Sequence, residues 1–170
     1  YYILPVPPSP NLNTSLSVLL YPSICLFEGT VISLGRGTYI PFTVLGAPVL
    51  SSRYEFHFKP VSIPGMSEHP LYEDSVCYGI DLSATDTASL RKRKQLDLQW
   101  LFEMYKNYPQ QELFFDASRS RQIGNFDKLA STSTLRNQIL QGKSEAYIRK
   151  SWEPGLSAYK TKRKKYLLYP

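Results

Sequence analysis

The sequence contains few of the residues that form metal centres, disulfide frameworks and nucleophilic active sites. Its 170 residues include two cysteines, Cys25 and Cys77, and two isolated histidines, His57 and His69. Two cysteines without further ligands at suitable spacing do not make a zinc site. No glycine-rich phosphate loop and no Ser/His/Asp set is present either. We therefore expect neither a metal nor a cofactor, whereas a Cys25–Cys77 disulfide and two free thiols both remain open.

Long apolar runs are also missing. No stretch of eighteen apolar residues exists, so the sequence predicts no membrane span. No secretory signal is visible at the start, but the chain opens on YYILPVPP without an initiator methionine, which is typical of the middle of a protein. We therefore expect a fragment of a longer protein, and the missing signal says little about where that protein works.

The net charge of +6 comes from two short clusters. Residues 91–94 supply four basic side chains and residues 160–165 supply five, and without them eleven basic residues face fourteen acidic ones. The clusters could contact a polyanion such as a wall polymer or nucleic acid. They could equally be solvated helix ends, where cations stabilise the helix dipole. Neither cluster is interleaved with aromatic residues, so we favour helix ends and expect no nucleic-acid partner.

The order of the predicted elements indicates an α+β fold. Residues 1–13 are proline-rich and should be extended, and residues 14–170 fit a single domain. Strands come first and helices concentrate in the C-terminal half, so we expect a small, mostly antiparallel sheet with helices packed on it. The expected strands cover residues 32–34, 41–45, 54–58 and 75–82, with a proline-containing loop at residues 60–70.

Capping residues and apolar spacing predict the helices. Thr14 or Ser15 could cap a short helix that stops near Pro22, and residues 23–29 could add a further turn. The longest helix should run over residues 88–108, with one apolar stripe on the core. The remaining helical segments are expected at residues 126–129, at residues 133–140, after Ser144, and from Pro154 onward.

The segment YPSICLFEGTVISLGRGT, residues 21–38, places two charges in apolar or glycine-rich surroundings. Glu28 follows a phenylalanine and precedes a glycine, and Arg36 stands between two glycines. Glycoside hydrolysis commonly uses two carboxylates, and Glu28 could be one of them. A guanidinium fork such as that of Arg36 suits a planar anion. Alternatively, Glu28 and Arg36 form an internal ion pair that fixes two loops.

Further side chains could complete a site around this segment. Tyr39 and Tyr78 could stack on a sugar face, although tyrosines in such segments are more often packing residues. Thr38 could add a hydroxyl contact, although hydroxyls in turns usually bond the backbone. Asp81 could be a second carboxylate or could cap a turn. Three other aspartates look like helix-start residues: Asp86, Asp116 and Asp127.

Several short motifs, in their order and spacing, resemble one known family. They are PSPNL at residues 8–12, YP at 21–22, CLFEGT at 25–30, GRGT at 35–38, PF at 41–42, GAP at 46–48, CYG at 77–79, FD at 126–127, and Arg163 with YLLY at 166–169. The chain is similar over nearly its whole length to the C-terminal domain of NamZ-type exo-β-N-acetylmuramidases, bacterial enzymes of peptidoglycan turnover.

The resemblance implies a function that the residues alone do not. It implies one wall of a cleft that binds terminal N-acetylmuramic acid. An N-terminal Rossmann-like half, absent here, would carry the main catalytic glutamate, and Glu28 would be auxiliary to catalysis. The side chains expected to contact muramyl saccharides are Arg36, Thr38, Tyr39 and Tyr78. The fragment alone would be inactive, and the parent would be periplasmic or secreted. A non-catalytic carbohydrate-binding or structural module is the alternative.

Overall fold

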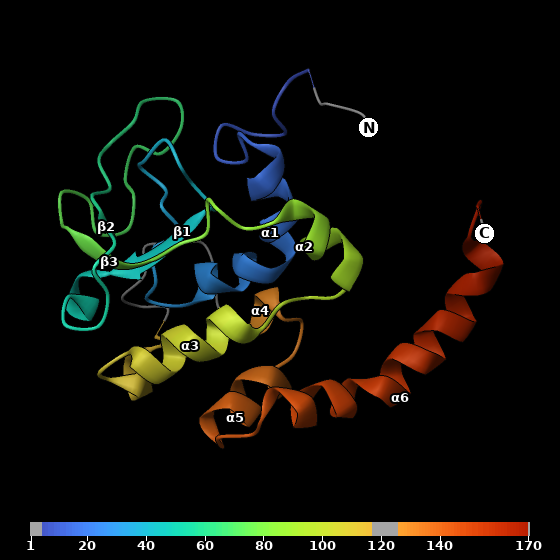
Figure 1. Ribbon diagram of the computed structural model, residues 1–170. Helices are drawn as coiled ribbons and strands as arrows, with labels where there is room; N and C mark the ends of the chain where they lie inside the picture. The colour runs from blue at the N-terminus through green and yellow to red at the C-terminus, as the bar shows by residue number, and fades with distance from the viewer. Residues whose placement is uncertain (1–4, 117–125, 170) are drawn as a thin grey trace. The chain divides into compact units, whose positions relative to one another are not determined.

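The computed structural model describes residues 5–116 and 126–169 of the chain (Figure 1). The chain divides into two compact units, residues 1–133 and residues 134–170. The described residues contain a three-stranded antiparallel sheet, in the first unit, and six α-helices. The predicted α+β class is therefore confirmed. The predicted organisation, an extended segment to residue 13 followed by one domain, stays a prediction.

The sheet is small and has the order β1-β3-β2, with β3 antiparallel to both neighbours. Its strands are β1 Val44–Ala47, β2 His57–Phe58 and β3 Cys77–Asp81. Gly79 on β3 lies opposite Gly46 on β1. A methyl group on Gly79 would come within 1.8 Å of the Leu45 carbonyl oxygen. Glycine at this register position therefore lets the two strands approach each other.

Only one of the four predicted strands overlaps a strand of the structure by more than two residues. The strand predicted over residues 75–82 is confirmed as β3. Residues 32–34 form a single bridge, from Ser33 to Gly46, and the strand predicted there is wrong. The strand predicted over residues 54–58 shrinks to the two residues of β2. Strand length depends on the partner available, which alternation within one segment does not show.

The predicted strand at residues 41–45 begins later than expected. The Thr43 N–H still closes a turn onto the Ile40 carbonyl at 3.3 Å, and Phe42 has a left-handed backbone. Extended pairing can start only after this turn, so β1 begins at Val44. The loop predicted over residues 60–70 contains an isolated bridge from Ile63 to Ser67 but no strand.

The first helix leads directly into the Glu28 segment. α1 is Ser15–Ile24, and Thr14 and Ser17 form a reciprocal capping box at its start. The helix runs through Pro22 and continues as the 3₁₀ turn η1, Cys25–Gly29. The cap predicted at Thr14 and the further turn predicted after Pro22 are both confirmed.

The single helix predicted over residues 88–108 is wrong, because two helices occupy the segment. They are α2 Thr87–Arg93 and α3 Gln99–Asn107. Asp86 caps α2, because its carboxylate accepts hydrogen bonds from two backbone N–H groups, as expected for a helix-start aspartate. Lys94 ends α2 in a left-handed conformation with a φ of 48°. The apolar spacing is correct within α3, but it does not reveal the break that precedes it.

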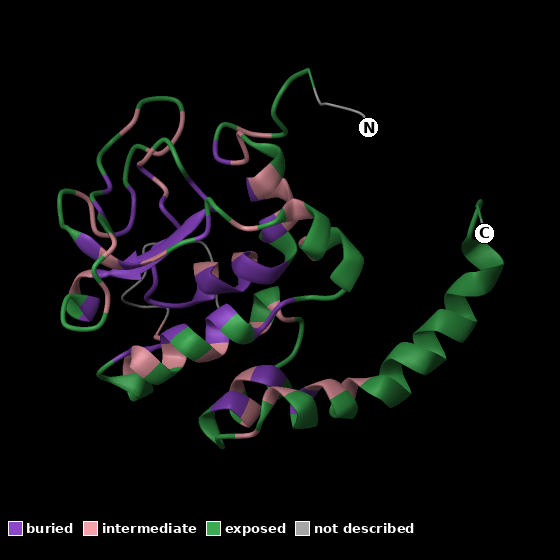
Figure 2. Ribbon diagram, viewed as in Figure 1, coloured by how far each residue is buried: buried purple, intermediate pink, exposed green. Residues whose placement is uncertain are grey.

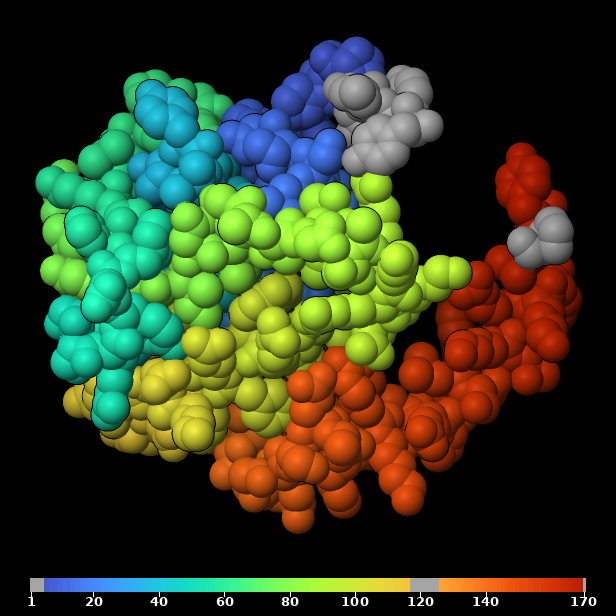
Figure 3. All heavy atoms as spheres, in the orientation of Figure 1, coloured from blue at the N-terminus to red at the C-terminus, as the bar shows by residue number. Residues whose placement is uncertain are grey.

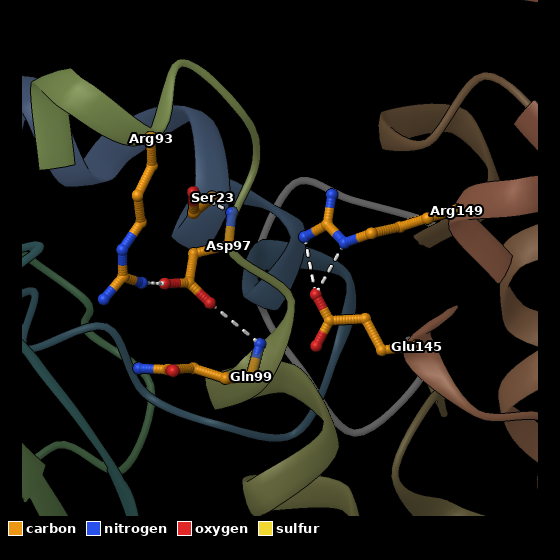
Figure 4. Close-up of polar contacts among 6 residues, drawn as sticks. All are labelled: Ser23, Arg93, Asp97, Gln99, Glu145 and Arg149. Atoms are coloured by element: carbon orange, nitrogen blue, oxygen red, sulfur yellow. Dashed lines mark hydrogen bonds and ion pairs between the residues drawn. The ribbon is translucent and has the colours of Figure 1, made fainter. Parts of the chain in front are cut away.

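A polar network around the buried Asp97 holds this break in place (Figure 4). The Asp97 carboxylate accepts from the Arg93 guanidinium and from the Gln99 N–H. The Asp97 N–H donates to Ser23 Oγ at 2.9 Å. Because Asp97 is buried and Ser23 lies on α1, the network joins three helices. Its bonds compensate for those that a continuous helix would have made.

Aromatic side chains form much of the core of the first unit. Phe27, Phe114 and Phe126 are fully or almost fully buried, and the Val31 N–H donates to the Phe114 carbonyl. α4 packs on η1, so the core supports the segment that carries Glu28. The short elements of this region are η2 Pro48–Leu50, η3 Gln111–Leu113 and α4 Phe126–Leu129.

The second unit is helical. It consists of α5 Thr134–Leu140, α6 Glu145–Arg163 and the 3₁₀ turn η4 Lys164–Tyr166. The Ser144 cap is confirmed, since its side chain accepts from the Tyr147 N–H. The separate helix predicted from Pro154 is wrong, because α6 passes through Pro154 without a break. A proline there removes one helical hydrogen bond, which a helix tolerates at a cost in stability.

Candidate functional site

Glu28 is held by a tightly anchored turn. It lies in η1 directly after the fully buried Phe27. Thr30 closes the turn, since its N–H and its hydroxyl both donate to the Phe27 carbonyl at 2.9 Å. A methyl group on Gly29 would lie 2.4 Å from the Phe126 Cα, so glycine permits this close contact with α4. The backbone beside Glu28 is therefore fixed on both sides.

Arg36 stands at the tip of a turn that two glycines make possible. Gly35 and Gly37 have φ values of 72° and 80°, in the left-handed region that glycine adopts without strain. The Thr38 N–H and hydroxyl both donate to the Gly35 carbonyl, at 3.1 and 2.6 Å. The Val61 N–H donates to the Gly37 carbonyl at 2.8 Å. Hydrogen bonds thus stabilise the turn internally and join it to the neighbouring loop at Val61.

Glu28 and Arg36 form an ion pair that is open to solvent on one side. Arg36 Nη2 donates to Glu28 Oε1, and the Arg36 and Glu28 side chains are 32% and 17% exposed. The internal pair considered as an alternative is therefore present. A guanidinium has five N–H donors, and this bond uses one. Within the described residues the Nε and Nη1 groups of Arg36 have no acceptor, so they remain available to a second anion.

The Phe42 ring packs against the Arg36 side of the ion pair, a contact that the sequence did not predict. The Arg36 guanidinium carbon lies 4.8 Å from the centroid of the buried Phe42 ring, a cation–π contact. The Tyr21 ring packs on Phe42 at 5.3 Å, with Tyr21 itself at the surface. Phe42 has a φ of 58°, and such backbone strain in a bulky residue is typical of functional sites. No sequence signal marks a left-handed phenylalanine.

The other predicted site residues are placed less favourably. Thr38 uses its hydroxyl within the turn, donating to Gly35 and accepting from the Ile40 N–H. Tyr39, next to it, is 80% exposed. Tyr78 lies on β3, where its ring is 5.7 Å from that of His57. The structure therefore brings Arg36, Thr38 and Tyr39 into one loop beside Glu28. It records no contact of Tyr78 with them, and the substrate contacts of all four residues stay predictions.

The predicted second carboxylate has a local structural role. Asp81 Oδ1 accepts from the Ser83 N–H at 2.8 Å, which caps the turn after β3. Turn capping was one of the two interpretations of this residue, and no described carboxylate other than Glu28 bonds Arg36. The described residues thus place one carboxylate and one guanidinium together. This arrangement suits the recognition of an anion, whereas acid–base catalysis would need a second carboxylate.

Both thiols are free in the structure. Burial raises the pKa of Cys77 to about 12, and burial followed by the Glu28 charge raises the pKa of Cys25. Because the thiolate is the reactive form, both thiols should alkylate slowly at pH 8. We expect Cys25 to label faster as the pH rises and Cys77 to label only on unfolding. Mass spectrometry after iodoacetamide treatment measures this, and a disulfide-linked peptide would contradict it.

Other parts of the described structure offer less. No group of three or more histidine, cysteine or acidic side chains among the described residues could hold a metal ion. Within the same ranges no helix is long and apolar enough to cross a membrane. A pocket of about 270 Å³ opens between α2 and α3, and its lining includes Asp86, Arg93, Gln99 and Trp100. None of the predicted site residues lines it.

Comparisons with known proteins give consistent matches. A family model described as the C-terminal part of the exo-β-N-acetylmuramidase NamZ matches residues 19–169. The peptidoglycan β-N-acetylmuramidase NamZ of Bacillus subtilis (strain 168) is 34% identical over 171 residues, which is 95% of this chain and 40% of that protein.

Two solved structures extend these matches. One, a DUF1343 family protein from Bacteroides fragilis NCTC 9343, is 40% identical with a TM-score of 0.87 and covers 99% of this chain and 45% of its own. A second DUF1343 protein from the same organism, 18% identical with a TM-score of 0.64 over 97% of this chain and 45% of its own, is similar in fold. The chain therefore spans less than half the length of these relatives.

Proposed function

The chain belongs to the family of NamZ C-terminal domains, and on that premise we propose that it is the C-terminal half of a bacterial peptidoglycan-degrading exo-β-N-acetylmuramidase. In this proposal it forms one wall of the cleft that binds a terminal N-acetylmuramic acid residue. The rest of the polypeptide, a Rossmann-like half, forms the other wall and carries the main catalytic glutamate. Its substrate lies in the cell wall, so the assembled enzyme works in the periplasm or outside the cell.

The partly exposed Glu28–Arg36 ion pair is the observation that supports this proposal. N-acetylmuramic acid differs from N-acetylglucosamine by a lactyl group that ends in a carboxylate. Arg36 keeps donors free in a planar fork, and a carboxylate fits such a fork with two parallel bonds. The Gly35–Gly37 turn and the Phe42 ring fix the guanidinium before any ligand arrives. A donor that is already in place loses little entropy on binding, which favours selectivity for the muramyl group.

Glu28 orients Arg36 in this proposal and adds negative charge beside the sugar. The Glu28 carboxylate uses one N–H of Nη2, so a lactyl carboxylate that makes two parallel bonds is directed to the other Nη2 hydrogen together with either Nε or Nη1. Tyr39 stands beside this turn at the surface, where a pyranose ring could stack on it. Thr38 fixes the turn through its bond to Gly35 and keeps one lone pair for a ligand. Tyr78 would reach only a more distant part of a longer saccharide.

One observation favours a second candidate, a binding module without chemistry. Glu28 is engaged by Arg36, and no second carboxylate joins it among the described residues. A complete glycosidase needs two carboxylates across the scissile bond, or one carboxylate and an equivalent group. The two candidates differ in the intact gene product: the enzyme cleaves a muramide, whereas the binding module retains it unchanged.

A chromogenic β-N-acetylmuramide, supplied to the intact gene product and separately to the 170-residue chain, tests the proposal. We expect turnover by the intact protein and none by the chain alone, because the chain lacks a complete acid–base pair. Saccharide binding by the intact protein without any turnover would support the binding module. Turnover by the 170-residue chain that Glu28→Gln abolishes would contradict the division of labour between the two halves.

A further inference from the structure

The second half of α6 carries an apolar stripe that nothing in the described structure covers. From Glu153 to Tyr169 every described residue is exposed (Figure 2). In Figure 3 the same stretch is drawn as red spheres. Leu156, Tyr159 and Tyr166 are 48%, 59% and 67% exposed. Single exposed apolar side chains are ordinary, but a row of large ones along one helix indicates an interface.

The stripe continues a face that is buried at the start of the same helix. Ile148 is fully buried and Trp152 is half-buried. At 100° per residue, Ile148, Trp152, Leu156 and Tyr159 fall within about 80° of each other around the helix axis. The opposite face carries Lys150, Glu153, Ser157 and Thr161. The amphipathic pattern thus extends about two turns beyond Trp152, where burial ends.

The exposed half of α6 also lacks the intrinsic stability to remain helical by itself. Pro154 and Gly155 lie together in the middle of the helix. A proline inside a helix costs about 3 kcal/mol relative to alanine and a glycine about 1 kcal/mol. Helices of this length are marginal in water even with favourable sequences, and most of their stability comes from packing. A packing partner is therefore needed to keep the helix over Leu156 and Tyr159.

The charges around the stripe indicate the chemistry of the partner. At 100° per residue, Lys160 and Lys162 lie about 40° beyond the two edges of the apolar face. Arg163 stands at the end of the face, and Lys164 and Lys165 extend the positive charge. Among the described residues none of these five cations has an ion-pair partner. The complementary surface is an apolar groove with carboxylates along its edges.

We propose that this face, formed by α6 from Trp152 onward and by η4, docks into such a groove on the part of the same polypeptide that lies outside these 170 residues. More than half of the length of the relatives has no counterpart in this chain. A segment of the same polypeptide is present at high effective concentration, so it binds in preference to a free partner of equal affinity. The proposal rests on the proposed function only in needing a further domain. α6 then holds the two halves together at a place separate from the Glu28–Arg36 pair.

Hydrogen exchange of the intact gene product tests the proposal without reference to its activity. We expect the amides of residues 153–163 to exchange at least tenfold more slowly than unstructured amides, because a docked helix opens rarely. Leu156→Asp combined with Tyr159→Asp should abolish this protection and loosen at least one peptide outside the 170 residues. Ser157→Asp combined with Thr161→Asp adds the same charge on the opposite face and should change neither region.

A second measurement on the unaltered protein covers the case in which the aspartate variant fails to fold. A zero-length carbodiimide cross-linker should join lysines of the 160–165 cluster to carboxylates outside the 170 residues, within one molecule. Rapid exchange of residues 153–163 in the wild type, or cross-links only between molecules of a concentration-dependent dimer, would overturn the proposal. Sedimentation with phosphatidylglycerol vesicles tests for membrane binding. If the intact protein sediments with the vesicles and the variant with Leu156→Asp and Tyr159→Asp does not, the face binds a lipid surface and the proposal is overturned.

Discussion

Arg36→Ala in the intact enzyme is expected to lower the cleavage of a β-N-acetylmuramide selectively. A hydrogen bond to a charged group typically contributes ~1.5–3 kcal/mol, which corresponds to about a tenfold to hundredfold loss in kcat/KM for the muramide. The matching β-N-acetylglucosaminide lacks the lactyl carboxylate, so its slower cleavage should change little. The ratio of the two kcat/KM values is therefore the measurement.

Two further variants separate recognition from a purely structural pair. Arg36→Lys retains the charge near Glu28 but lacks the planar fork, and it should recover only part of the muramide preference. Glu28→Gln removes the charge of the pair while leaving Arg36 free, so it should retain the preference better than Arg36→Ala. If Arg36→Ala lowers the melting temperature while the ratio of substrates is unchanged, Arg36 serves only to hold Glu28.

Gly79→Ala is expected to destabilise the first unit more than any other single methyl group near the sheet. The added carbon would lie 1.8 Å from the Leu45 carbonyl oxygen and 2.7 Å from the Gly46 Cα, and both are backbone atoms. The strands must separate to admit it, which we expect to cost more than about 3 kcal/mol. For a unit of this size the melting temperature should fall by about 6–12 °C.

Val76→Ala provides the matched control for the sheet. Val76 is 41% exposed and lies one residue before β3, so its truncation should change the melting temperature by less than a few degrees. Calorimetry of both variants in the intact gene product makes the comparison. Equal melting temperatures for Gly79→Ala and the wild type would show that β1 and β3 are not paired in the register described here.

Local signals predicted some elements correctly because their causes lie within a few residues. The caps at Thr14, Asp86 and Ser144 each bond a backbone N–H two or three residues away, so the sequence contains both partners. The α+β class follows from the order of elements in the same way. By contrast, the break at Lys94 depends on Asp97 bonding Ser23, more than seventy residues earlier in the chain, and no local pattern contains that contact.

The candidate site was predictable in composition and only partly in geometry. The glycines around Arg36 and the apolar neighbour of Glu28 indicated two held charges, and the structure pairs them. The support from Phe42 was not predictable, because its left-handed backbone results from how the turn meets β1. Tyr78 belonged to a shared motif, but the strand register places it beside His57. A motif identifies residues, whereas the register decides which of them meet.

A crystal structure of the intact gene product with N-acetylmuramic acid would show whether Arg36 binds the lactyl carboxylate of that sugar. We expect the lactyl carboxylate to lie within 2.7–2.9 Å of Arg36 Nε or Nη1, the distance of a charge-assisted bond, with Glu28 still on Nη2. A sugar bound elsewhere, with Arg36 contacting Glu28 alone, would show that Arg36 does not recognise the lactyl group.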